Sequence, residues 1–209
     1  MATLGLPAIA MAQQPTFLHK WGGPIGLCLT LFMLSYTIGV VQPIMPPMVQ
    51  EFNSSVGFVQ SALVLMSLVT ASFTPTAENL SRRLGRIWMF GLALGLFALG
   101  LATVVFSPDM GVFTLGLAGL MGLASTILVS TPVALMDSFY HDEVTKKYAL
   151  LALTIAGVLG ALVGSITGGV MAFELSWRWA FALEFALLPI IWLLVRRIQT
   201  PYPPGDAAH

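Results

Sequence analysis

The ten residues ENLSRRLGRI, from Glu78 to Ile87, place three arginines and a glutamate between two long apolar runs. The whole chain of 209 residues has only nine lysines and arginines, so three of them in one short stretch need a physical reason. The apolar runs on either side are each about 20 residues long, the length that a helix needs to cross the hydrocarbon core of a bilayer. We therefore interpret residues 78–87 as a charged connection between two membrane-spanning helices.

The composition of the whole chain agrees with a membrane protein. Charged residues make up 9% of the chain and hydrophobic residues 57%, and the mean hydropathy is +0.88. Soluble domains carry about 25% charged and about 45–50% apolar residues. The formal net charge is zero, and the basic residues are too few and too scattered for a nucleic-acid partner. We expect the lipid bilayer to be the environment of this chain.

Six apolar runs are long enough to span a bilayer: residues 24–42, 56–77, 87–106, 112–136, 149–171 and 179–195. Polar or proline-rich stretches separate them, and we expect Pro43, Pro46 and Pro47 to end the first span. The sequence therefore predicts an all-α membrane protein. Residues 1–21 are interpreted as an N-terminal segment, residues 22–197 as a six-helix membrane bundle and residues 198–209 as a C-terminal tail.

The basic residues fall almost entirely on one side of the predicted bundle. Because successive connections alternate between the two sides, one side receives Lys20, Arg82, Arg83, Arg86, Lys146, Lys147, Arg196 and Arg197. Only Arg178 falls on the other side. Cytoplasmic loops carry the excess of lysine and arginine. We therefore expect both termini to be cytoplasmic and the protein to be a multi-pass protein of the cell's inner (plasma) membrane.

The charged connection resembles the signature loop of the major facilitator superfamily, G-x-L-a-D-r-x-G-r. The matching residues are Leu80, Ser81, Arg83, Gly85 and Arg86. Three further stretches resemble motifs of the drug-exporter branch of that family. They are IMPPMVQEFNSS after the first span, GALVGSITGG in the fifth span and SWRWAFALE at the start of the sixth. Together the four motifs cover the chain from about residue 22 to residue 197.

This resemblance implies a facilitator-type bundle built from 3+3 inverted repeats, with the substrate between two such bundles. The chain has one bundle, so a second half is expected from a homodimer or from another six-helix chain, unless the sequence is a shortened relative of a longer exporter. The implied function is movement of a small-molecule substrate by alternating access. The alternative is a non-transporting membrane subunit or assembly factor that retains the fold. No nucleophile–base pair, phosphate loop or metal-ligand spacing is present, so we expect no enzyme, no catalytic residue, no cofactor and no metal.

The sequence departs from the family pattern at several positions. The acidic position of the signature loop is Arg82 and its first glycine is Glu78. If this segment is helical, these two residues form an i,i+4 pair. The arginine that proton-driven exporters usually carry in the fourth span is Ala118, and the proline of the fifth-span motif is Ser165. The usual apparatus for proton-coupled antiport is therefore incomplete.

The fifth span carries a glycine every fourth residue, at Gly160, Gly164 and Gly168. These residues share one helix face and permit close approach of another helix. The resemblance implies that this face, with Ser165 and Gly169 of the same motif, packs between the two halves of a transporter. Packing within one bundle is the alternative. A lone bundle is expected to leave this face, like its cavity face, toward lipid.

Glu184 is the candidate functional acid, because a carboxylate inside a membrane is expensive and marks a functional hypothesis. It lies six residues after Arg178, hence about 9 Å deeper along a helix. It is interpreted as a protonatable or cation-binding group in a central cavity, or alternatively as a neutral carboxyl or helix–helix hydrogen bond. Other candidates for a transport path, which could equally be polar contacts between helices, are Gln42, Gln60, Ser67, Thr70, Ser125 and Thr126. Trp177 and Trp179 are interpreted as interfacial anchors.

Overall fold

The structure is a computed structural model that describes residues 17–139 and 143–196, with the side chains of residues 22–136 and 143–196. Residues 1–16, Arg197 and the predicted tail over 198–209 lie outside the described residues, as does the side chain of Lys20. The helices are α1 (Phe17–Glu51), α2 (Val56–Leu84), α3 (Arg86–Val105), α4 (Met110–Thr114), the π-helix η1 (Leu115–Met121), α5 (Gly122–Phe139), α6 (Glu143–Glu174) and α7 (Trp177–Val195).

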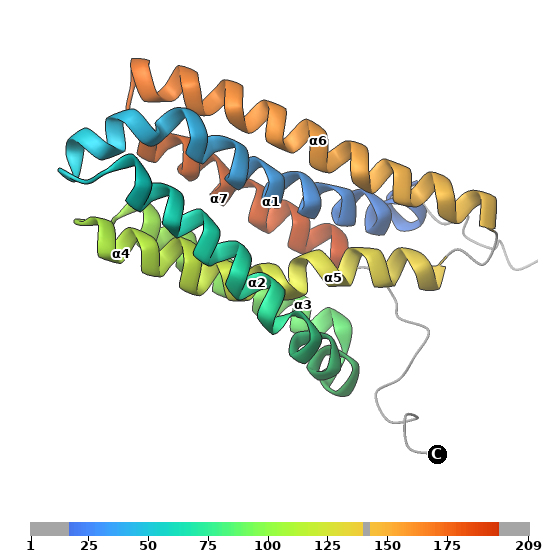
Figure 1. Cartoon of the computed structure of the whole chain (residues 1–209). Coiled ribbons are helices and arrows are strands. Elements are labelled where there is room, and N and C mark those ends of the chain that lie inside the picture. The colour runs from blue at the N-terminus through green and yellow to red at the C-terminus, as the bar shows by residue number, and fades with distance from the viewer. Residues whose placement is uncertain (1–16, 140–142, 197–209) are drawn as a thin grey trace, which may run out of the picture.

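Six membrane spans are confirmed by length and composition, because α4, η1 and α5 run on as one span from Met110 to Met136. The described residues contain no β-strand. The helices lie side by side as a bundle (Figure 1). The α1–α2 turn marks one end of it, which we call the Glu51 end, and the α2–α3 turn marks the other, which we call the Gly85 end. The predicted all-α membrane fold is thus correct.

Side-chain caps begin three helices at the Glu51 end. Ser55 accepts a hydrogen bond from the backbone N–H of Phe58 at the start of α2, and Asp109 accepts one from Val112 at the start of α4. Ser176 does the same for the N–H of Arg178 in α7. Each cap satisfies one of the N–H groups that the first turn of a helix leaves without an internal partner.

The charged connection is shorter than the sequence predicts. Helix α2 continues to Leu84 and α3 begins at Arg86, which leaves Gly85 alone between them. Its φ of 96° lies in a region that residues with a side chain rarely adopt. Its N–H donates to the carbonyl oxygen of Ser81 and closes α2. The arginines therefore lie on the last turn of α2 and the first turn of α3.

The prediction that prolines end the first span is wrong, because α1 continues through Pro43 and its neighbours to Glu51. Proline lacks the N–H that would bond the carbonyl four residues earlier, here that of Gly39. The hydroxyl of Ser165, on α6, lies 3.3 Å from this carbonyl oxygen and 2.9 Å from that of Ala161, so its one proton is shared between the two acceptors. Proline is tolerated inside membrane helices where a neighbouring helix satisfies the freed backbone group in this way.

The glycines of α6 pack against α1 inside the bundle. A Cβ atom built on Gly160 would overlap the carbonyl oxygen of Phe32, and one on Gly164 would overlap that of Tyr36. One on Gly168 would lie 3.0 Å from the carbonyl oxygen of the α1 backbone that it faces. Of the two alternatives for these glycines, packing within the bundle is the one observed. The expectation that they would face lipid is wrong, because α1 covers them.

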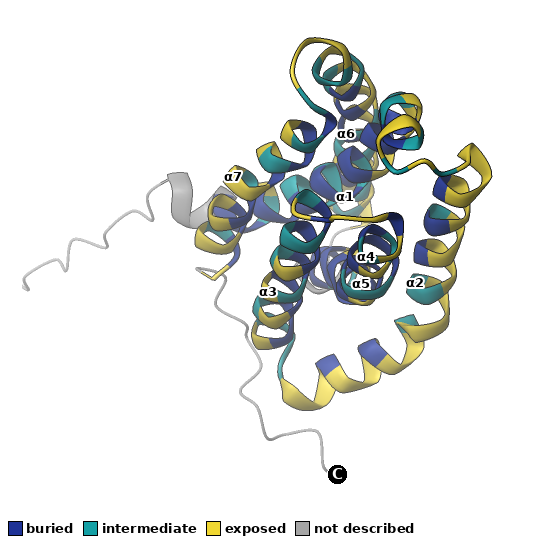
Figure 2. Cartoon of the chain, turned by 90° about the vertical axis from the view of Figure 1, so that its left-hand side faces the viewer, coloured by how far each residue is buried: buried dark blue, intermediate teal, exposed yellow. Residues whose placement is uncertain are grey.

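The six spans differ greatly in how far they are enclosed. In the most apolar 18-residue stretch of each, 56% of residues are buried in α1 and 61% in the α4–η1–α5 span, but only 17% in α2 and in α6. Viewed from the Glu51 end, α3 and α7 cover one side of the central spans, while α2 and α6 flank them (Figure 2). The bundle therefore has a closed side and a side bordered by its two most exposed helices.

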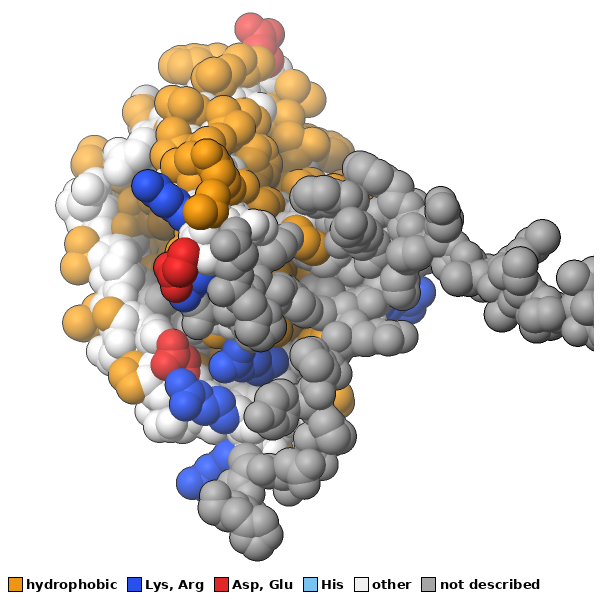
Figure 3. Space-filling view, turned by 90° about the vertical axis from the view of Figure 1, so that its right-hand side faces the viewer, with side chains coloured by type: hydrophobic (Ala, Val, Ile, Leu, Met, Phe, Trp, Pro, Cys, Tyr) orange, Lys and Arg blue, Asp and Glu red, His pale blue; other side chains and the backbone are white. Residues whose placement is uncertain are grey.

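Basic side chains gather at the Gly85 end, as the alternation of connections predicts (Figure 3). The described ones are Arg82, Arg83 and Arg86 around the α2–α3 turn, Lys146 and Lys147 at the start of α6, and Arg196 after α7. Arg178 lies at the Glu51 end. The charge asymmetry between the two ends is thus a property of the folded bundle.

Candidate functional site

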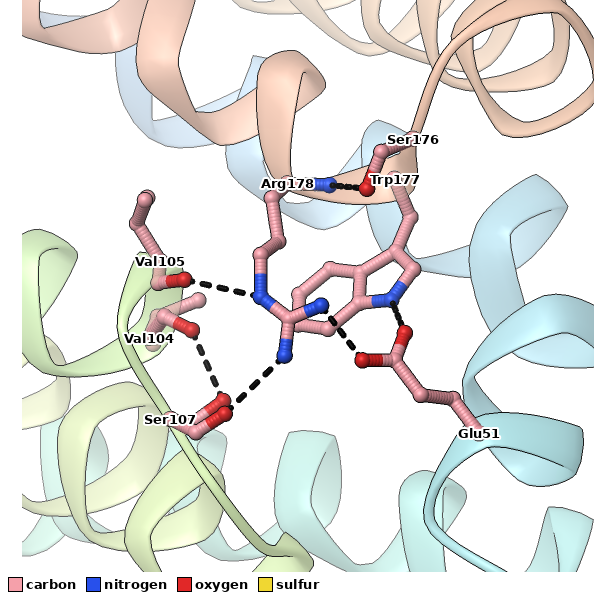
Figure 4. Close-up of polar contacts among 7 residues, drawn as sticks. All are labelled: Glu51, Val104, Val105, Ser107, Ser176, Trp177 and Arg178. Carbon is pink, nitrogen blue, oxygen red and sulfur yellow. Dashed lines mark hydrogen bonds and ion pairs between the residues drawn. The ribbon is translucent and has the colours of Figure 1, made fainter.

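A charged and aromatic cluster closes the Glu51 end (Figure 4). Arg178, in the first turn of α7, donates from Nη1 to Oε1 of Glu51, at the end of α1. Its Nε donates to the carbonyl oxygen of Val105 and its Nη2 to that of Ser107, both at 3.0 Å. One guanidinium therefore joins α7 to the ends of α1 and α3. We call this group, together with Trp177, the Arg178 clamp.

Trp177 completes the clamp through contacts with both Glu51 and Arg178. Its Nε1 donates to the second carboxylate oxygen of Glu51 at 2.6 Å, and the guanidinium carbon of Arg178 lies 4.5 Å from its ring centroid. The ring is 2% exposed and packs edge-on against Phe52, Phe113 and Phe181. The prediction that Trp177 is an interfacial anchor is therefore wrong, because the ring is enclosed by the bundle. Charge-assisted bonds of this type are among the stronger hydrogen bonds in proteins.

The sequence contained a signal for this clamp that charge counting did not use. Glu51 follows the first predicted span and Arg178 precedes the sixth, yet the alternation of connections puts both on the same side of the membrane. Arg178 is also the only basic residue there. The carbonyl partners of Arg178 could not be foreseen, because they depend on how α3 ends.

Glu184 is fully buried, at a contact between α1 and α7. Its Oε2 lies 3.0 Å from the hydroxyl oxygen of Thr37, and its Oε1 has no hydrogen-bond partner among the described residues. The Thr37 hydroxyl also lies 3.1 Å from the carbonyl oxygen of Met33. Of the alternatives for Glu184, the structure shows the hydrogen bond between helices.

Two further hydroxyl groups bond between helices at Ala180, one helical turn before Glu184 on α7, and were not singled out from the sequence. The hydroxyl of Tyr36 donates to the carbonyl oxygen of Ala180 at 3.1 Å, and the hydroxyl of Thr167 donates to Tyr36 at 2.9 Å. We call Tyr36, Thr37, Thr167 and Glu184 the Glu184 cluster. Its residues come from α1, α6 and α7, so it forms a polar contact among these three helices. Hydroxyls are common in the apolar spans, so nothing in the sequence distinguishes these.

The other predicted path residues do not form one site. Thr70 donates to the carbonyl oxygen of Gly122 at 3.1 Å and so links α2 to α5. Ser125 and Thr126 are buried and bond to carbonyl groups of their own span. Gln42, Gln60 and Ser67 are exposed. The set therefore separates into interior contacts and exposed polar groups.

Gln42 belongs to a regular pattern of exposed residues on α1. Its C-terminal half exposes every fourth residue, namely Ile38, Gln42, Pro46 and Gln50. Residues four apart share one face of a helix. Because α5, α6 and α7 pack against the rest of α1, this face opens on the side between α2 and α6 (Figure 2). We call these four residues the α1 stripe.

An apolar groove of about 480 Å³ lies toward the Gly85 end of the bundle. It lies between α1, α5 and α6, and Cys28, Phe32 and Tyr148 are among its wall residues. Ligand pockets typically are of this size and are mostly apolar with a few polar groups. The groove could hold the apolar part of a small organic molecule.

The signature-loop residues are held in different ways. Arg86 donates from Nη1 to the carbonyl oxygen of Ala134 on α5, at 3.1 Å, whereas Leu80 and Arg83 are exposed. Glu78 and Arg82 are both on α2, yet no hydrogen bond or ion pair joins them in the part of the chain that the structure describes. The expected i,i+4 pair is thus not formed. Their side chains instead border a pocket between α2, α3 and α5.

Ala118 lies in η1, where the resemblance implies an arginine, and its side chain is buried. Nearby, a Cβ atom on Gly100 of α3 would lie 2.6 Å from the Met121 side chain. Because Ala118 is 1% exposed, a larger side chain at this position would have to displace the residues packed around it. In the described residues, no three His, Cys, Asp or Glu side chains gather as a metal-binding group.

Comparison with known proteins identifies relatives over most of the chain. The family model described as Major Facilitator Superfamily matches residues 27–208. The chain is 27% identical over 190 residues to the aspyridones efflux protein of Neocamarosporium betae, which covers 89% of this chain and 32% of that protein. It is 26% identical over 179 residues to the drug efflux pump JefA of Mycobacterium tuberculosis, covering 84% and 35% respectively.

A third relative is the quinolone resistance protein NorB of Staphylococcus aureus. The identity is 24% over 172 residues, which cover 82% of this chain and 37% of that protein. The chain therefore spans about a third of the length of the curated relatives that it matches.

Proposed function

Because this chain belongs to the major facilitator superfamily, we propose that it is one six-helix half of a transporter that moves a small solute by alternating access. The expected drug-exporter branch agrees with relatives whose names describe efflux of drugs or of aspyridones. We propose export of amphipathic organic molecules for this chain. A family of transporters also agrees with the expectation that the chain is not an enzyme.

The α1 stripe is the observation that carries this proposal. It presents the amides of Gln42 and Gln50 from the C-terminal half of α1, most of whose other residues are buried or half-buried. Polar side chains in membrane spans usually face the bundle interior or a water-filled cavity, because exposure to lipid is costly. A second half on the side between α2 and α6 would shield these amides and line a path with them.

The second half would be a second copy of the chain, another six-helix chain or a further part of a longer protein. A symmetric pair about an axis along the membrane normal would bring α2 and α6 of one bundle against those of the other. The exposed apolar residues of α6 that would enter such an interface include Ile155, Leu162 and Ile166. The groove of about 480 Å³ would then lie beside the path and receive the apolar part of the solute.

Within this proposal, Glu184 acts as a neutral hydrogen-bonding group. An ionised carboxylate in the bilayer interior costs at least about 2.5–3.5 kcal/mol. The hydroxyl of Thr37 has a single proton and two oxygen neighbours, Met33 O and Glu184 Oε2. Both contacts become hydrogen bonds if Thr37 donates to the carbonyl and a protonated Glu184 donates to Thr37.

A non-transporting membrane subunit remains the second candidate, and Ala118 favours it. The position lacks the arginine of proton-driven exporters, and the alanine in its place is buried. The only acid fully buried in the described spans, Glu184, is engaged with Thr37 on the closed side. A bundle that had lost coupling but kept its packing would have these properties.

One experiment separates the two candidates. The molecular mass of the purified chain is first measured in mild detergent. The chain is then reconstituted in vesicles loaded with a fluorescent amphipathic dye. If the chain transports, its mass in detergent should exceed that of one bundle. Dye should also cross the membrane faster than it does in dye-loaded vesicles without protein. Gln42→Ala should reduce this movement, whereas Leu99→Ala, an exposed position on α3, should not. A monomer without dye movement would favour the non-transporting subunit.

A further inference from the structure

A small polar pocket lies at the Gly85 end, between α2, α3 and α5, and it takes no part in the proposed transport path. Its volume is about 50 Å³. A single water needs roughly 10–15 Å³ of such space, so the pocket has room for a few waters or one small ion. It is too small for an organic solute.

The walls of this pocket are rich in hydrogen-bond donors. They include Ser81, Arg82 and Arg86, together with Ser130 and Thr131 of α5. The carboxylate of Glu78 also borders the pocket, so the charged residues around it sum to one positive charge. A cation would meet two guanidinium groups here, whereas a monoanion would be attracted.

Ser81 gives an independent sign of a ligand. The residue is 5% exposed, and its hydroxyl is buried with no hydrogen-bond partner among the described residues. Leaving a buried polar group unpaired costs about 1–3 kcal/mol. The side chain lines the pocket, so its free donor is available to whatever occupies it.

The two arginines are suited to an anion for different reasons. Arg86 is anchored to the carbonyl oxygen of Ala134 by one nitrogen, which holds its guanidinium at the pocket wall. It is also the first residue of α3, where the helix dipole adds positive potential. Arg82 has no hydrogen bond or ion pair within the described part of the chain, so its donors are uncommitted.

We propose that this pocket binds one small oxyanion of the phosphate type, held by Arg82, Arg86 and the hydroxyl of Ser81. The planar guanidinium group matches the paired oxygens of phosphate, and one anion satisfies all three groups at once. The single positive charge of the surroundings fits a monoanion, such as dihydrogen phosphate or the phosphodiester of a membrane lipid. The site is independent of whether the bundle transports.

The test uses thermal unfolding of the purified full chain in a non-ionic detergent. Sodium phosphate is compared with sodium chloride at equal ionic strength, so that general screening cancels. Wild type should unfold about 2–4 °C higher in phosphate. Arg82→Gln should lose this increase, and Ser81→Ala should retain less than half of it. Arg83→Gln is the matched control, since it removes the same charge from the adjacent exposed residue.

A second arm distinguishes the source of the phosphate group. The same variants are placed in nanodiscs of phosphatidylglycerol or of an uncharged glycolipid. A stability gain in phosphatidylglycerol that Arg82→Gln abolishes, without any effect of free phosphate, assigns the site to a lipid phosphodiester. A gain with free phosphate that Arg82→Gln abolishes and Arg83→Gln keeps assigns it to the soluble ion, because general stabilisation by phosphate would persist in both variants. The proposal is overturned if neither source stabilises the wild type, or if Arg83→Gln loses as much of the gain as Arg82→Gln.

Discussion

The hydroxyl of Ser165 lies 3.3 Å from the carbonyl oxygen of Gly39, the backbone group on α1 that Pro43 leaves without a helical donor. In the motif that the fifth span resembles, proline occupies the position of Ser165. A proline there could not have supplied this donor. The departure from the motif therefore has a local structural role, because it places a hydroxyl beside the carbonyl that Pro43 leaves without a helical donor.

Replacing Ser165 by alanine should lower the free energy of unfolding by about 1 kcal/mol, the usual contribution of one hydrogen bond. Ser67 is the matched control, because its hydroxyl also bonds a carbonyl of its own helix but has no acceptor on another helix. Unfolding by denaturant in detergent would measure both. Equal effects of Ser165→Ala and Ser67→Ala would show that the contact with Gly39 contributes nothing.

Gly160→Ala should be strongly destabilising, because the added methyl group meets the α1 backbone rather than a flexible side chain. Overpacking of this kind costs about 1–3 kcal/mol. Gly95→Ala on α3 is the control, since no heavy atom lies within 4 Å of its added methyl group. The control should be neutral or slightly stabilising. If both variants unfold at the same temperature, α1 and α6 do not pack as closely as described.

The pair Glu51 and Arg178 should be energetically coupled. A double-mutant cycle with Glu51→Gln and Arg178→Gln is expected to give a coupling energy of about 1 kcal/mol. The value is modest because the side chains are 42% and 30% exposed, so solvent screens the charges. The same cycle with Glu78→Gln and Arg82→Gln should give a coupling near zero, since those two residues form no ion pair. Similar coupling in both cycles would argue against a specific clamp.

Glu184→Gln should leave the bundle folded, because an amide can replace a neutral carboxyl beside Thr37. Glu184→Ala should lower the unfolding free energy by about 2–4 kcal/mol, since it leaves a cavity and an unpaired hydroxyl. Circular dichroism during heating would compare the two. Severe destabilisation by Glu184→Gln would instead indicate that the ionised carboxylate is the folded form. Loss of dye transport in a well-folded Glu184→Gln would point to a coupling role.

Both termini and the Gly85 end are proposed to face the cytoplasm. Cysteines at Lys147 and at Glu174, near opposite ends of α6, report this in a Cys28→Ala background. A thiol reagent that cannot cross membranes should label Glu174→Cys on intact cells, and Lys147→Cys only after the cells are permeabilised. The reverse pattern would invert the topology.

The sequence was sufficient for the number, order and approximate limits of the spans, because each depends on local hydropathy. It failed where a distant group changes a local rule. The carbonyl that Pro43 leaves without a helical donor lies near a hydroxyl from another helix, and Trp177 is buried against the rings of Phe52 and Phe113 from other parts of the chain. Glu184 could be singled out as an unusual acid, but its partner Thr37 could not be told from other hydroxyls in apolar spans. Packing, unlike hydropathy, depends on contacts between segments that are far apart in the sequence.

The Arg178 clamp also limits how this bundle can move. It ties α1 and α3, from the first half of the chain, to α7, the last helix, so spans from both ends of the sequence share one guanidinium. Separating these helices at the Glu51 end would break the Arg178–Glu51 ion pair and the two hydrogen bonds from Arg178 to backbone carbonyls at the same time. Large displacements should therefore carry the closed side as one rigid body, with hinges at its border with α2 or with a neighbouring molecule.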